Sequence, residues 1–402
     1  MRHVSRLTCQ PQCPSPSFPP KPSNLNLSKP KSPTRTFPTS SNSSDTPKLD
    51  PKPTRTKPPT YFIHFGISRQ WLSDAQQEWA SSYDWRKTEA RINSHPNFTV
   101  PIVDKNEDGH GTGFVFDIHF IALFSNKIGC RSSPPSPRLA GQLSGISRRA
   151  GRPEIEVHTP ETLPFHVIVP SLPGYGYSSG PPLDRDFTTE GMALLMNKLM
   201  VGLGFGNGYV SQGGDIGSFI SRAQGELEGL TDKEKKGMER YGNFDTLGNA
   251  YAREHGTRPS TIGLVLSASP ISLLAWVGEK FLPWSDTSPS TTEILDSVTL
   301  YWFTQSFPRA IYPYRQFFGA NPTLFHNDLQ YYIQKPLGYP CHPQELAPVP
   351  RKWVAETGNL VWYREHESGG HFAAMEKPET FVKDIEEFVK EVWPEARKRD
   401  CN

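Results

Sequence analysis

The chain has no long uninterrupted apolar run and no excess of charge of either sign. Its longest apolar stretch, around residues 264–277, is broken by three serines and a proline, so we expect no membrane-spanning helix. The 43 Lys and Arg residues nearly balance the 41 Asp and Glu residues. The net charge therefore provides no general electrostatic attraction between this chain and nucleic acids or anionic surfaces. These absences predict a protein without a membrane span and without a nucleic-acid partner.

Cysteine is scarce and scattered. The five cysteines are odd in number and form no regular spacing, and no apolar secretory segment begins the chain. A disulfide framework is therefore not expected, and a reducing, cytoplasmic compartment fits this composition best. The positions are Cys9, Cys13, Cys130, Cys341 and Cys401.

Aliphatic residues are almost missing from residues 1–60, which are rich in Pro, Ser, Thr and Lys. Such a segment cannot bury enough apolar surface to offset the entropy lost on ordering. We therefore predict a disordered tail over 1–60. The absence of acidic residues before Asp45 allows an organellar transit peptide as an alternative, but the many prolines disfavour the amphipathic helix that such a peptide needs.

The rest of the sequence alternates between helical and strand-like patterns. Apolar residues at helical spacing follow a capping Ser68, another helix follows Thr188, and strand-like runs occur near 115–124, 166–169, 209–210 and 360–363. Residues 228–335 are helical in pattern and rich in aromatics and prolines. This order predicts an α/β fold, with a mostly parallel sheet between helices and a helical lid over about 228–335. The expected divisions are a short N-terminal domain over 61–105 and the main domain over 106–402.

The strongest motif is Gly213-Gly214-Asp215-Ile216-Gly217, directly after a predicted strand. Small residues on both sides of a central nucleophile are typical of the sharp strand-to-helix turn of α/β-hydrolases. A carboxylate at the centre can form an ester with an sp³ carbon, as in an epoxide or a haloalkane. A glycine-rich turn with a capping aspartate is the alternative interpretation.

The candidate base is His371, in a Gly-Gly loop after the last predicted strand, where the order nucleophile–acid–histidine places it. For the acid we choose Glu345, and the alternatives are Glu356, Glu365 and Glu367. The segment 104–115 imitates a calcium loop but ends in Val, not Glu. The glycines over 202–208 lack dinucleotide-binding spacing. Neither a metal nor a cofactor is therefore expected.

With these motifs in place, the chain resembles the microsomal-type epoxide hydrolases, in their fungal soluble branch, over roughly 62–395. The resemblance is carried by Tyr83-Asp84-Trp85-Arg86 with Pro96-Asn97-Phe98, by 167–217 and by the lid. It implies that Asp215 is the nucleophile, Glu345 the acid and His371 the base. It also implies that Tyr251 and Tyr314 donate to the epoxide oxygen, with Tyr312 as an alternative to Tyr314, and that the Ile216 N–H contributes to the oxyanion hole. The implied partner is a small apolar epoxide in detoxification or aromatic hydrocarbon catabolism, and a homodimer is possible.

The chain departs from this family where the H-G-x-P oxyanion loop belongs. Residues 137–147 read PRLAGQLSGIS, and permitted codons for them, read one nucleotide later, encode HGWPGSFLEF. We infer that about 128–157 is translated out of frame. The prolines at 134, 135 and 137 are incompatible with a central strand over that stretch, since proline cannot donate to a ladder. The family's next sheet strand, after residue 222, and the first helices of its N-terminal domain are also absent.

These observations leave several functional hypotheses. The first is an active epoxide hydrolase that needs no cofactor or metal. The second is a catalytically dead or mis-annotated homologue without the oxyanion loop. A haloalkane dehalogenase-like hydrolase is a third, but it would bind halide with Trp or Asn donors instead of paired tyrosines.

Overall fold

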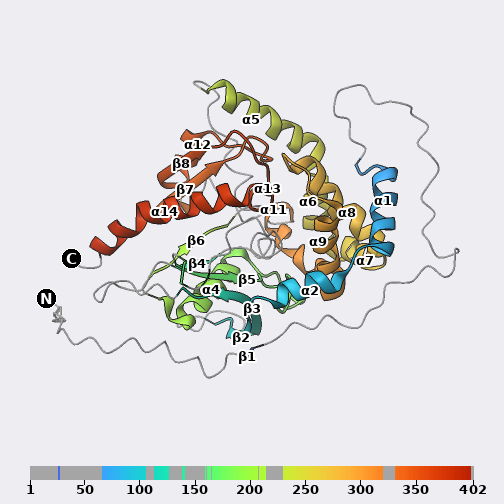
Figure 1. The fold of residues 1–402 in the computed structure, drawn as a ribbon, viewed down its shortest axis with the longest axis horizontal. Helices are drawn as coiled ribbons and strands as arrows, with labels where there is room; N and C mark the ends of the chain where they lie inside the picture. Colours follow the sequence, from blue (N-terminus) through green and yellow to red (C-terminus); the bar gives the residue numbers. More distant parts are fainter. Residues whose placement is uncertain are drawn as a thin grey trace.

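The computed structural model describes residues 26–27, 66–105, 113–125, 138–140, 159, 161–163, 165–206, 208–213, 230–319 and 331–399. Within these residues the strands form a six-stranded sheet in the order β1-β2-β3-β5-β4-β6 (Figure 1). Their bounds are β1 Asn26–Leu27, β2 Asn97–Val103, β3 Val115–Leu123, β4 Arg138–Ala140, β5 His166–Pro170 and β6 Val210–Ser211. The pairs β1–β2, β2–β3 and β3–β5 are antiparallel, and β4 runs parallel to β5 and β6. The two residues of β1 are ordered, although they fall inside the tail expected to be disordered.

Strand β4 corrects one expectation from the sequence. It lies inside the segment inferred to be out of frame, yet it sits between β5 and β6, with Leu139 opposite both Val167 and Val210. The strand begins directly after Pro137 and contains no proline, so proline's missing N–H does not interrupt the ladder. Its ladder spans three residues toward β5 and two toward β6. A central strand is thus present, but it is shorter than the five or six residues that are usual.

The remaining strands, β7 (Ile333–Cys341) and β8 (Gly358–Glu365), form a separate parallel pair. Among the described residues, no strand joins β6 to β7. Helix α14 (Pro378–Arg399) connects the two sheets instead and runs between them in Figure 1. Its Val389 packs with Val167 and Val169 of the larger sheet, while the Phe388 ring lies over Gly338 of β7, where an added Cβ would come within 2.6 Å.

The helices between residues 232 and 318 group on one side of the molecule (Figure 1), within the range 228–335 that we expect to form the lid. The two N-terminal helices α1 (Arg69–Ser81) and α2 (Trp85–Asn93) pack against it: Trp79 joins the buried cluster of lid residues, and Tyr83 Oη donates to Asp296 Oδ1 at 3.0 Å. The lid elements are α5 Asp232–Asn243, η4 Phe244–Gly248, α6 Ala250–Thr257, α7 Pro259–Ser267, α8 Pro270–Trp284, α9 Thr291–Thr304, α10 Phe307–Ala310, η5 Tyr312–Tyr314 and α11 Arg315–Phe318.

Local signals in the sequence set several helix starts. Ser68 accepts a hydrogen bond from Trp71 N at the start of α1, and Thr188 accepts one from Gly191 N at the start of α4 (Thr189–Met200). The remaining helices are η1 Val201–Phe205, α12 Arg351–Glu356 and α13 Ala373–Glu376. No single helix in the described parts of the chain is long and apolar enough to cross a membrane; α7 and α8 qualify only as a pair, bent by 117°.

Candidate active site

Two of the residues predicted to be catalytic lie in direct contact. The Nδ1 atom of His371 donates a hydrogen bond to Glu345 Oε1 over 2.8 Å. The His371 side chain is 5 % exposed and that of Glu345 24 %. Because the carboxylate accepts a hydrogen bond from Nδ1–H, the neutral ring has its unprotonated nitrogen at Nε2. That nitrogen is the atom that a general base uses. The structure therefore brings this predicted pair together.

The loops that carry the pair follow the carboxyl ends of the paired strands β7 and β8. Gly369 has φ +105°, a conformation that L side chains rarely adopt, and a Cβ at Gly370 would lie only 2.5 Å from Trp284 O. The His371 N–H donates to that same carbonyl over 2.9 Å, and the Gly369 N–H donates to Asp286 Oδ2 over 2.9 Å. The two glycines thus allow the loop to press against the end of α8, which fixes the backbone of the histidine.

Charge and hydrogen bonds stabilise the ionised form of the acid. Burial by itself raises the pKa of Glu345, but His371 and the Leu346 N–H, which donates to Oε1 over 2.6 Å, hold that pKa below its usual value. Arg240 of α5 donates from Nε to the Glu345 carbonyl oxygen over 2.7 Å and from Nη2 to Gln344 O over 2.9 Å. The lid therefore clamps the backbone of the acid loop. Sequence reasoning missed Arg240, since no local pattern marks a contact 105 residues distant.

The two candidate tyrosines contact each other, and one tryptophan lies between them and the candidate histidine. The Tyr251 and Tyr314 rings meet edge to face, with centroids 5.9 Å apart. Trp284 lies 5.3 Å from Tyr251 and 5.2 Å from His371, ring centroid to ring centroid. The sequence left the choice between Tyr314 and Tyr312 open. Because Tyr314 is the one whose ring contacts Tyr251, we keep it as the candidate. Trp284 was not singled out from the sequence.

A buried histidine, His255, lies behind both tyrosines. Its ring centroid is 5.5 Å from that of Tyr251 and 4.8 Å from that of Tyr314, and its Nε2 accepts from Trp276 Nε1 over 3.0 Å. Burial, with Lys280 nearby, lowers the pKa of His255 to about 4. The ring is therefore neutral at pH 7 and supports the tyrosine pair by packing.

The other predicted residues are either outside the described residues or exposed. Asp215 and Ile216 lie outside them; the last described residue before them, Gly213, follows β6. The three alternative acids, Glu356, Glu365 and Glu367, are all exposed, which favours Glu345 over them. The group of potential metal ligands found among the described residues is His342, His366 and Asp384, apart from the Glu345–His371 pair.

The sequence and the fold are similar to those of several known proteins. The solved structure of Aspergillus niger epoxide hydrolase is 43 % identical to this chain and superposes on it with a TM-score of 0.70. The match covers 85 % of this chain and 91 % of that chain. A *Dothistroma septosporum* protein assigned to the same family is 42 % identical over 362 residues, covering 82 % of this chain and 81 % of its own length. The chain belongs to the epoxide hydrolase family. The silkworm juvenile hormone epoxide hydrolase, 22 % identical with a TM-score of 0.67 over 87 % of this chain and 90 % of that one, shares the fold.

Two family models match separate parts of this epoxide hydrolase. The model for the epoxide hydrolase N terminus matches residues 35–133, and the α/β hydrolase fold model matches 157–226. The first match begins inside the segment expected to be a tail. Residues 134–156, which neither model covers, fall within the segment inferred from codons to be out of frame. The family assignment and the hydrolase class are thus confirmed, and the unmatched interval falls where the oxyanion loop was expected.

Proposed function

We propose that this site hydrolyses epoxides to vicinal diols through a covalent ester on Asp215. The observation that carries the proposal is the continuous contact from the tyrosine pair through Trp284 to His371, with Glu345 bonded behind it. An acid-oriented histidine facing two phenol donors supplies what both steps of the reaction require.

In the first step, a carboxylate oxygen of Asp215 attacks an epoxide carbon. The carbon–oxygen bond of the ring breaks and its electron pair moves to the epoxide oxygen. The hydroxyls of Tyr251 and Tyr314 hydrogen-bond that oxygen as its charge develops, and one of them transfers a proton. The aromatic side chains around them make the site suitable for a small apolar epoxide.

In the second step, His371 removes a proton from water through Nε2. The hydroxide attacks the carbonyl carbon of the ester, and the Ile216 N–H stabilises the oxyanion. The bond from that carbon to the alkyl oxygen then breaks, the departing oxygen takes the proton of the added hydroxyl, and the diol leaves as the Asp215 carboxylate is restored. The proton held by His371 returns to the tyrosine that was deprotonated in the first step. Glu345 stabilises the imidazolium that forms on His371. The step uses only side chains, backbone N–H groups and water.

The paired tyrosines favour an epoxide over a haloalkane as substrate. A dehalogenase must stabilise a departing halide, whereas an epoxide needs a proton donor at an oxygen that stays attached to the product. The rings of Tyr251 and Tyr314 are in contact, 5.9 Å apart between centroids, which supports a shared role for their hydroxyls at one oxygen.

We further propose that the chain as written is impaired in this reaction. The interval between the two family-model matches, residues 134–156, contains the place where the H-G-x-P loop belongs, and β4 beside it is only three residues long. A short central ladder leaves neighbouring strand edges less well paired, which invites aggregation. Loss of one oxyanion-type donor costs roughly 3 kcal/mol of transition-state stabilisation, about 100-fold or more in rate.

Side-by-side expression tests both proposals. One version is the chain as written; the other restores the reading frame over 128–157 and the missing strand after residue 222. Diol formation from a styrene-oxide-like substrate is measured in each. We expect a soluble, active restored enzyme and an insoluble or nearly inactive chain as written. Absence of diol from a soluble restored enzyme would overturn the function, whereas equal rates in the two versions would overturn the impairment.

A further inference from the structure

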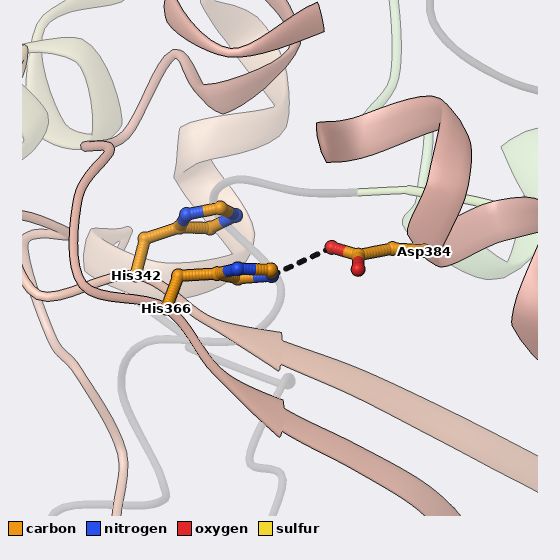
Figure 2. A group of neighbouring side chains, drawn as sticks. All are labelled: His342, His366 and Asp384. Atoms are coloured by element: carbon orange, nitrogen blue, oxygen red, sulfur yellow. Dashed lines mark hydrogen bonds and ion pairs between the residues drawn. The ribbon is translucent and has the colours of Figure 1, made fainter. Parts of the chain in front are cut away.

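Two histidines and an aspartate meet between the small sheet and helix α14, outside the proposed reaction. His342 follows β7 and His366 follows β8, and the pairing of Cys341 with Glu365 places them side by side. Their rings stack with centroids 4.6 Å apart and planes 13° apart. Asp384 of α14 faces them, with Oδ2 accepting from His366 Nε2 over 2.7 Å (Figure 2). One candidate ligand atom from each residue lies within 4.8 Å of the others.

The hydrogen bonding of His342 leaves its second nitrogen as a free acceptor. Nδ1 lies 3.2 Å from the carbonyl oxygen of Ser368, and a carbonyl can only accept, so Nδ1 carries the proton. Nε2 then holds the lone pair. This atom is buried and has no hydrogen-bond partner, in a residue that is 5 % exposed. A proton on one nitrogen held by a backbone carbonyl, with the other nitrogen free, is the arrangement that metal-binding histidines use.

The protonation state also suits a metal. Burial lowers the pKa of His342, with His366 acting in the same direction, while the Ser368 carbonyl and the nearby acids act against it. The neutral imidazole that results is the form that coordinates a metal ion.

The charges around Asp384 leave one of its oxygens available. Arg364 Nη1 is 3.4 Å from Asp384 Oδ1, a long contact, and the same guanidinium pairs closely with Glu387. Because Glu387 neutralises Arg364, the negative charge of Asp384 stays largely directed at the histidines. Its Oδ2 is the oxygen that already faces His366.

We propose that His342, His366 and Asp384 bind a divalent transition metal ion, with Zn²⁺ as the reference ion. Two imidazole nitrogens and one carboxylate oxygen are ligands that Zn²⁺, Co²⁺ and Ni²⁺ prefer, whereas Mg²⁺ and Ca²⁺ require more oxygen ligands. Zinc–ligand bonds of about 2.0–2.1 Å imply ligand atoms about 3.3 Å apart. On binding, the 2.7 Å distance between His366 Nε2 and Asp384 Oδ2 must therefore lengthen slightly. The other distances between ligand atoms, which are up to 4.8 Å, must shorten.

Such an ion would tie together the elements that carry the candidate catalytic pair. The His342 carbonyl oxygen accepts from Glu345 N over 3.2 Å, and His342 Nδ1 bonds Ser368, three residues before His371. A metal that joins β7, β8 and α14 at this point restrains both loops. We expect it to raise the thermal stability of the protein, independently of whether the proposed reaction occurs.

Zinc titration by calorimetry tests the site in the full 402-residue chain and in the frame-restored version, since both retain all three ligands. We expect one equivalent of Zn²⁺ to bind and to raise the melting temperature, with no response to Mg²⁺. Asp384→Asn keeps the size and hydrogen-bonding capacity of the side chain, so it should leave the fold intact while weakening Zn²⁺ at least tenfold. His342→Ala should do the same.

Two control variants distinguish this site from other zinc ligands. His95→Ala removes a histidine far from the cluster, and Cys341→Ser removes the thiol beside His342; both should bind Zn²⁺ normally. The absorption spectrum of bound Co²⁺ should lack the thiolate charge-transfer band. Absence of stoichiometric Zn²⁺ binding by folded protein, binding unchanged in Asp384→Asn and His342→Ala, or binding abolished by Cys341→Ser would each overturn the proposal.

Discussion

Replacing Glu345 by Gln tests the candidate acid with little change of shape. Oε1 of Glu345 accepts from both His371 Nδ1 at 2.8 Å and Leu346 N at 2.6 Å. A glutamine can place its amide oxygen at the position of Oε1. The Leu346 N–H favours this orientation, because flipping the amide would put the NH₂ group, another donor, against the Leu346 N–H. The histidine should therefore keep its tautomer and lose only the negative charge beside it.

The expected loss follows from that geometry. A hydrogen bond to a charged group contributes about 1.5–3 kcal/mol, which corresponds to roughly 10- to 150-fold in rate. Exchange of a triad carboxylate for an amide that imposes the wrong tautomer costs about 10⁴-fold. Since Leu346 opposes that tautomer here, we expect Glu345→Gln to slow ester hydrolysis about 100-fold, with ester formation nearly unchanged.

Rapid-quench kinetics with mass spectrometry separate the two steps. In the frame-restored enzyme, Glu345→Gln should accumulate the covalent adduct while diol release slows. Glu365→Gln is the matched control, because Glu365 is exposed and lies outside the candidate pair. An unchanged rate of diol release in Glu345→Gln, or an equal loss in the control, would refute the assignment of Glu345. A 10⁴-fold loss would show that the amide does turn and that Leu346 does not fix it.

Three further predictions address the nucleophile, the lid and the core. Asp215→Asn should abolish the covalent adduct, and His371→Gln should trap it on Asp215. If peptide mapping found the adduct on another residue, the assignment of Asp215 as the nucleophile would be wrong. Tyr251→Phe or Tyr314→Phe alone should slow diol formation, since each lost donor costs roughly 3 kcal/mol of transition-state stabilisation. The double variant should nearly eliminate diol formation; an unchanged rate in it would mean that the tyrosines only pack. Burial lowers the pKa of His119 from 6.5 to about 4, so between these two pH values the unfolded state binds more protons than the folded state. The contribution of His119 to the free energy of unfolding is complete above pH 6.5 and falls by about 3 kcal/mol as the pH drops to 4. Urea melts of a His119→Gln variant should lose that part of the dependence of stability on pH.

The sequence predicts those features whose cause is local. Side-chain caps set the starts of α1 and α4, at Ser68 and Thr188, because a capping oxygen acts within three residues of itself. The position of His371 after β8 follows from strand order, since a residue just past the carboxyl end of a strand falls at the edge of the sheet. Such features need no knowledge of distant contacts.

Features created by distant contacts were not predicted. Trp284 lies between Tyr251 and His371 only because α8 ends against the Gly369–Gly370 loop. Arg240 reaches the acid loop across the lid, and nothing in its neighbours distinguishes it from the surface charges of α5. The same holds for β4, whose pairing with β5 and β6 depends on the surrounding sheet and not on its own three residues.

Among the described residues, the contacts that build the acid–base half of the site come from outside 128–157. Glu345 and His371 are held by β7, β8, Arg240 of the lid and Trp284, and α14 fastens this unit to the larger sheet through Val389. The Asp215 half instead follows β6, whose described strand partner is the short β4. Restoring the frame should therefore change the nucleophile half and leave the acid–base pair as it is.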